Sequence, residues 1–143
     1  MKALVQQRAR IARVRRVQHM QAAAAAQSAE GQLIQLETSA ERLAALRGSL
    51  AIVPGRCTGA ALSGNGELAM RLDNARAGLG DAIASARAVA AERAAQRLEA
   101  RRRKESAEKL NNRAAAALVQ MIEQRASASR PRRARAGFPG DDE

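Results

Sequence analysis

The feature that most constrains this chain is a heptad-like spacing of apolar residues that occurs twice. Residues 2–50 and 67–128 each carry alanine, leucine, isoleucine or valine at alternating intervals of three and four residues. Such spacing lines one face of a helix with apolar side chains, which are then buried against a second helix. Residues 51–66 lie between the two segments and contain a proline and several glycines, which favour a reversal of the chain. The sequence therefore predicts an all-α fold, a long antiparallel two-helix coiled-coil hairpin.

The same spacing predicts which residues form the seam between the helices. Leu4, Ile11 and Val14 share one face of the first segment, and the seam then continues after a small phase shift within residues 22–26. Every face of that run is alanine, so the register is weakly specified there. The other expected seam residues are Ala22, Ala26, Ala29, Leu33, Leu36, Ala40, Leu43 and Leu50 in the first segment, and Leu68, Leu72, Ala75, Leu79, Ala82, Ala86, Val89, Ala107, Leu110, Ala114, Ala117 and Met121 in the second.

Helix boundaries follow from capping residues and glycines. Ser63 or Asn65 is available as the N-cap of the second helix. Gly78 and Gly80 would each cost about 1 kcal/mol inside a helix. Gly80 and Asp81 could also form a C-cap followed by an N-cap. Because the apolar spacing passes through the glycines without a phase change, we favour an unbroken helix over residues 67–128.

The end of the chain differs in composition from the hairpin. Residues 129–143 are first arginine-rich and then acidic, and they carry no apolar spacing. Such a composition predicts a disordered tail after a helical hairpin over residues 1–128.

Composition argues against an enzyme. The hydrophobic fraction is 46%, but the aromatic fraction is 1%, so a many-layered core or a deep pocket is not expected. His19 and Cys57 are the single histidine and cysteine, and the carboxylates are scattered. We therefore expect no catalytic, cofactor or metal site. No run approaches the ~18 apolar residues that a membrane span needs, so the sequence predicts a cytoplasmic protein with no transmembrane segment.

The charge of the chain is high and unevenly placed. The formal net charge is +11, and no acidic residue precedes Glu30. In an antiparallel hairpin the two termini meet, so the basic start of the chain and the arginine-rich stretch 97–113 would share one end. This basic end has two interpretations: a solvated arginine face, or a docking surface for an acidic partner.

Two segments resemble the FliJ family, the small coiled-coil component of the flagellar type III export apparatus. They are the basic, Ile/Val-spaced opening at residues 8–20 and the Lys/Glu/Arg-rich stretch at residues 101–113. The resemblance implies a stalk whose paired ends dock on a hexameric export ATPase at the inner face of the cell membrane. It also implies contact with the membrane export gate protein and with export chaperones. The docking residues that it implies are Arg8, Ile11, Arg13, Val14, Arg15, Arg16, Leu118, Met121 and Ile122.

Two further hypotheses remain. One is a basic helical protein of the nucleoid type that binds phosphates non-specifically. The lack of base-stacking aromatic residues and the acids within the second segment argue against it. The other is a plain coiled-coil oligomer, in which separate chains associate through the alanine-rich seams.

Overall fold

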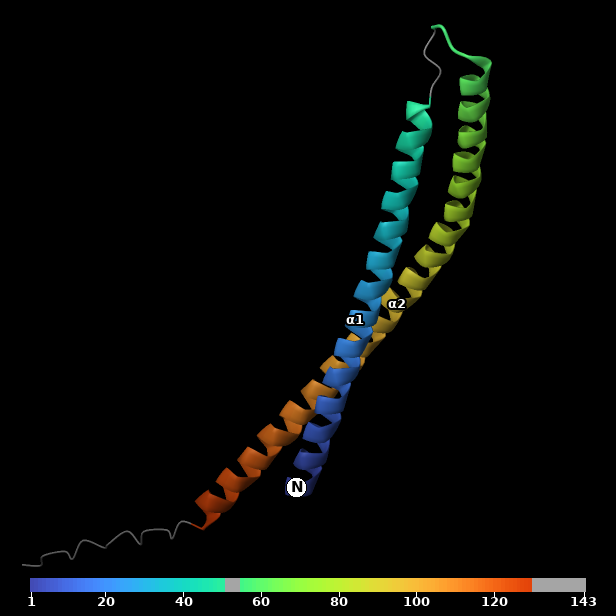
Figure 1. Ribbon diagram of the computed structural model, residues 1–143. Coiled ribbons are helices and arrows are strands. Elements are labelled where there is room, and N and C mark those ends of the chain that lie inside the picture. Colours follow the sequence, from blue (N-terminus) through green and yellow to red (C-terminus); the bar gives the residue numbers. More distant parts are fainter. Residues whose placement is uncertain (51–54, 130–143) are drawn as a thin grey trace, which may run out of the picture. The chain divides into compact units, whose positions relative to one another are not determined.

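The computed structural model describes residues 1–50 and 55–129, and within them the chain forms two long helices packed together (Figure 1). Helix α1 spans Lys2–Ser49 and helix α2 spans Gly59–Ala128, and the described residues contain no strand. The expected all-α class is therefore confirmed. The predicted disorder of the tail falls almost wholly on residues 130–143, which lie outside the described residues.

The contacts between α1 and α2 divide the chain into two units. Among the described residues, the terminal unit comprises Met1–Val14 and residues 105–129, and the loop unit comprises residues 15–50 and 55–104. Each unit contains one stretch of α1 and one stretch of α2.

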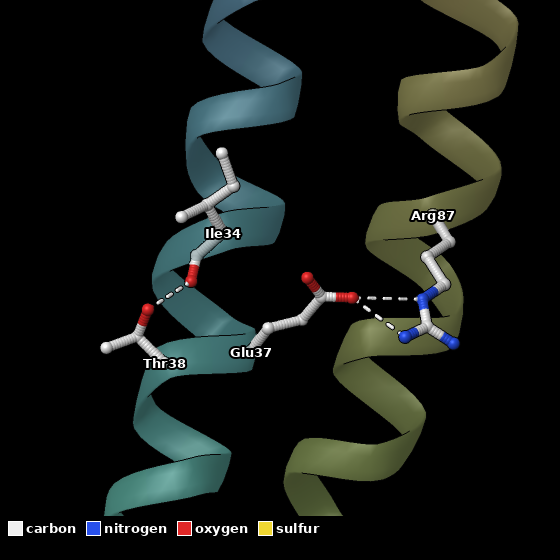
Figure 2. A network of polar contacts seen from close by, with 4 residues as sticks. All are labelled: Ile34, Glu37, Thr38 and Arg87. Carbon is white, nitrogen blue, oxygen red and sulfur yellow. Dashed lines mark hydrogen bonds and ion pairs between the residues drawn. The ribbon is translucent and has the colours of Figure 1, made fainter.

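Two ion pairs between the helices fix the antiparallel register of the loop unit. Arg87 Nη2 lies 2.7 Å from Glu37 Oε1 (Figure 2), and Arg47 Nε lies 3.2 Å from Asp73 Oδ2. As α1 advances from Glu37 to Arg47, the partner position on α2 moves back from Arg87 to Asp73. Ion pairs as exposed as these contribute at most about 1 kcal/mol each to the free energy of folding. They therefore indicate how the two helices are aligned but add little stability.

The seam on α1 follows a single heptad phase, which corrects the expected phase shift. Ala12 is only 5% exposed, and Ala26 and Ala29 are also buried, whereas Leu4 and Ile11 are 43% and 46% exposed. A phase shift would require a local change in helix winding, and a constant phase requires none. The half-buried or buried residues that share this phase are Val5, Arg8, Ala12, Arg15, His19, Ala22, Ala26, Ala29, Leu33, Leu36, Ala40, Leu43, Arg47 and Leu50.

Consequently the expected seam face of Leu4, Ile11 and Val14 is wrong. These three side chains lie beside or opposite the seam and remain exposed. The phase instead comes from the part of α1 that carries Leu33, Leu36 and Leu43, and the alanines of residues 22–29 are small enough to continue it.

The seam on α2 agrees with the sequence at most positions. Eight expected residues are buried or half-buried: Leu72, Leu79, Ala82, Ala86, Ala107, Ala114, Ala117 and Met121. Ala75 is exposed, contrary to the expectation. At three other positions the seam lies one residue later than expected, because Leu68, Val89 and Leu110 are exposed while Ala69, Ala90 and Asn111 are half-buried.

Helix α2 begins at Gly59 rather than near Glu67, so the connection is shorter than the predicted 51–66. Its N-cap is Thr58, whose hydroxyl oxygen accepts a hydrogen bond from the backbone N–H of Ala61 at 3.3 Å. The expected caps, Ser63 and Asn65, lie inside the helix. The helix then continues unbroken through Gly78 and Gly80, as predicted.

The described core is thin. Its buried side chains are all alanines, and no large side chain in the described ranges is fully buried. Alanine permits a close approach of two helices but contributes little apolar area, so other surfaces of the helices retain exposed apolar residues. Neither helix, within these ranges, is long and apolar enough to cross a membrane.

Candidate docking surface of the terminal unit

The structure places most of the residues expected to bind a partner in the terminal unit. Ile11 and Val14 lie on α1, and Leu118, Met121 and Ile122 lie on α2. Arg8 and Arg13 also belong to this unit, whereas Arg15 and Arg16 belong to the loop unit. The proposed set is therefore not a single site, and the terminal unit contains the larger part of it.

Arg8 has a structural role that the sequence did not reveal. Its side chain lies in the half-buried seam of α1, and Nη1 donates a hydrogen bond to the backbone carbonyl oxygen of Leu110 at 3.2 Å. The guanidinium therefore joins α1 to α2. Its long apolar stem lies between Val5 and Ala12 along the seam of α1.

Part of the terminal unit forms an open hollow of about 500 Å³. Leu118, Met121 and Ile122 line it, together with Met1, Lys2 and Arg125. The sequence predicted the three α2 residues but not the other three. Met1 and Lys2 could be inferred from the antiparallel pairing of the two ends, because residues at the start of α1 must face residues near the end of α2.

Apolar side chains on the outside of this unit are more exposed than those in its seam. Val14 is 50% exposed, and the seam residues Ala12 and Ala114 are each 5% exposed. Single exposed apolar residues are common on protein surfaces, and the loop unit carries them too, whereas neighbouring ones on one side of a helix pair can form an interaction surface. The exposed large apolar residues of the unit are Met1, Leu4, Ile11, Val14, Leu110, Val119 and Ile122.

The charge of the same unit is predominantly basic. Arg10, Arg13, Lys109 and Arg113 are exposed, and the structure gives none of them an ion pair within residues 1–50 and 55–129. Residues 1–14 contain no acidic side chain. An acidic partner would therefore meet no carboxylate on the α1 part of the unit, whereas the α2 part carries Glu105, Glu108 and Glu123.

The described residues form no recognisable metal-binding site. No group of three or more His, Cys, Asp or Glu side chains among them could hold a metal ion, and Cys57 is an exposed free thiol. His19 lies half-buried in the seam of the loop unit.

Comparison with known proteins adds no family to this description. No family model, no curated protein and no solved structure matches the chain. The class that the fold defines is a two-helix coiled coil whose helices run antiparallel.

Proposed function

We propose that the protein is a non-enzymatic helical stalk or adaptor of a flagellar-type (type III) protein export apparatus. Its terminal unit would dock on the hexameric export ATPase and link it to the membrane export gate protein and to export chaperones. The protein would act in the cytoplasm, at the inner face of the membrane.

The main support for this proposal is the orientation of side chains at the start of α1, where the larger apolar residues face away from α2. Arg8 and Ala12 occupy the seam, while Leu4, Ile11 and Val14 remain exposed, as do the neighbouring Arg10 and Arg13. A helix that needed to pack only against its own partner would place these apolar residues inward. Their exposure supports a second contact, made with another protein.

The identity of the partner is supported by sequence resemblance. Residues 8–20 and 101–113 resemble the charged segments of FliJ-type stalks, which dock on a hexameric ATPase through their paired ends. Both segments contribute to the terminal unit, at residues 8–14 and 105–113.

Co-purification with the export ATPase of the same cell tests the proposal. Arg10→Glu combined with Arg13→Glu reverses two exposed charges in the terminal unit, and we expect it to abolish co-purification. The matched control is Arg42→Glu with Arg76→Glu, which makes the same charge change at exposed positions of the loop unit. Far-UV circular dichroism should show unchanged helicity in both variants.

Two results would count against the proposal. The first is wild-type protein that fails to retain the ATPase, and the second is equal retention by both double variants. Duplex DNA binding that survives about 200 mM salt would favour the nucleoid-type alternative, because weak non-specific attraction to phosphates fades at that ionic strength.

A further inference from the structure

One flank of the terminal unit presents apolar residues from both helices on the same side. Leu4 and Ile11 each precede a seam residue of α1 by one position, and Leu110 and Ala117 each precede a seam residue of α2 by one position. In an antiparallel pair, positions that precede the seam on the two helices lie on the same side of it. The hydrogen bond from Arg8 to the carbonyl of Leu110 fits this arrangement, because Arg8 lies one helical turn before Ile11 on α1.

We call this surface the apolar flank and define it as Leu4, Ile11, Val14, Leu110 and Ala117. Three of its large side chains, Leu4, Ile11 and Leu110, are 43–48% exposed, and Val14 is 50% exposed. Leu4 and Ile11 are separated by one heptad, about 10 Å along the helix axis. Another helix with apolar residues at heptad spacing would therefore match the repeat of the flank.

Basic side chains border the apolar flank on both helices. Arg10 lies one position before Ile11, and Lys109 lies one position before Leu110. Arg113 lies one turn after Leu110. All three are exposed, and the described part of the chain supplies no ion pair to them. A helix that occupied the flank would place the residues beside its own apolar stripe close to these three cations.

The same charges argue against two other occupants. A second copy laid on the flank with its own flank would bring like charges together, which is unfavourable in a desolvated contact. The end of this chain is also a poor match, because residues 130–143 contain four arginines against three acidic residues.

We propose that the apolar flank binds an acidic amphipathic α-helix of another protein, which packs as a third helix against α1 and α2. Apolar side chains of that helix contact Leu4, Ile11 and Leu110, and its carboxylates pair with Arg10, Lys109 and Arg113. The proposal rests on the proposed function, since it assigns a chemistry to the partner contact of the same unit.

A synthetic helical peptide tests the proposal with the full-length protein. The probe carries leucine at its seam positions and glutamate at the flanking positions, and fluorescence anisotropy of a labelled peptide reports binding. A second peptide has lysine in place of every glutamate, and a third has serine in place of every leucine. We expect binding of the first peptide alone.

Matched protein variants then locate the contact. Ile11→Glu with Leu110→Glu should weaken binding of the acidic leucine peptide by about tenfold or more, the loss expected when buried apolar contacts are removed. The control is Ile34→Glu with Leu46→Glu, which changes two comparably exposed apolar residues of the loop unit and should leave binding unchanged. Circular dichroism verifies that both variants stay helical.

Several results would overturn the proposal. They are failure of the acidic leucine peptide to bind, equal binding of the serine peptide, and equal weakening by both variant pairs. Deletion of residues 130–143 that strengthens peptide binding would identify the chain's own end as the occupant. Light scattering that shows a dimer lost in Ile11→Glu with Leu110→Glu would identify a second copy.

The outcomes also separate this proposal from the export function. Specific peptide binding without retention of the export ATPase would leave the apolar flank intact and remove the export role. Retention of the ATPase by Ile11→Glu with Leu110→Glu would remove the apolar flank as the docking surface and leave the export role intact.

Discussion

Asn111 is a polar residue at a seam position that would normally hold an apolar side chain. It occupies a seam position on α2, and its Oδ1 is buried with no hydrogen-bond partner among the described residues. A buried acceptor that lacks a partner costs roughly 1–3 kcal/mol, because the hydrogen bond to water is lost and not replaced. The seam of the terminal unit is therefore weakened at this position.

We predict that Asn111→Leu raises the free energy of unfolding by about 1 kcal/mol or more, since it removes the unsatisfied acceptor and adds apolar area. Urea denaturation followed by circular dichroism measures the change. Asn112→Leu is the matched control, because Asn112 is exposed and the helix-propensity gain is the same. An equal gain in both variants would assign the effect to helix propensity alone.

At the scale of the helix, Thr58 decides where α2 begins. Its hydroxyl caps the N–H of Ala61, one of the groups that has no partner within the helix. We predict that Thr58→Ala lowers the free energy of unfolding by about 1 kcal/mol. Thr38→Ala should cost less or be neutral, because Thr38 Oγ1 bonds the carbonyl of Ile34 inside α1 (Figure 2) and alanine is the better helix former. The same denaturation experiment compares them, and equal losses would contradict the capping role.

The glycines of α2 give a second prediction at this scale. A Cβ atom at Gly78 or Gly80 would meet nothing within 4 Å, and neither residue has a positive φ. Gly78→Ala with Gly80→Ala should therefore raise the free energy of unfolding by about 1–2 kcal/mol, since each glycine costs about 1 kcal/mol in a helix interior. A rise in the thermal midpoint is the expected measurement. A fall would indicate that α2 bends at these glycines.

The two helices could be predicted from the sequence, but the phase of their seam could not. Alternating three- and four-residue spacing is visible for Leu33, Leu36 and Leu43, and the structure keeps them in the seam. Near the start of α1, Leu4 and Ile11 are more hydrophobic than Ala12, so the sequence favours them as seam residues. The structure nevertheless buries Ala12, because one heptad phase continues along the helix.

The start of α2 was missed for a related reason. Gly64 and Gly66 suggest a loop, yet the cap at Thr58 and the helix-forming run Ala60-Ala61-Leu62 start the helix before them. Of the predicted docking residues, Ile11 and Val14 are exposed, whereas Arg8 lies in the seam. Its contact with a backbone carbonyl leaves no signal in the sequence.

At the scale of the whole molecule, the two units differ in the pattern of their charges and in the contacts between their helices. The terminal unit combines the acid-free start of the chain with the apolar flank, whereas the loop unit carries the ion pairs of Glu37 with Arg87 and of Arg47 with Asp73. Alanine packing holds α1 and α2 together with little buried area. An additional helix on the terminal unit would therefore stabilise the protein as well as bind it.

The burial of neighbouring residues Ile11 and Ala12 tests the central claim most directly. In a Cys57→Ser background, Ile11→Cys and Ala12→Cys can each be labelled with a thiol reagent, and the two labelling rates can be compared. We predict that the thiol at position 11 reacts at least about tenfold faster, because reaction at position 12 requires local opening of the seam. Equal rates, or faster reaction at position 12, would place Ile11 in the seam and remove the exposed surface on which the proposed docking depends.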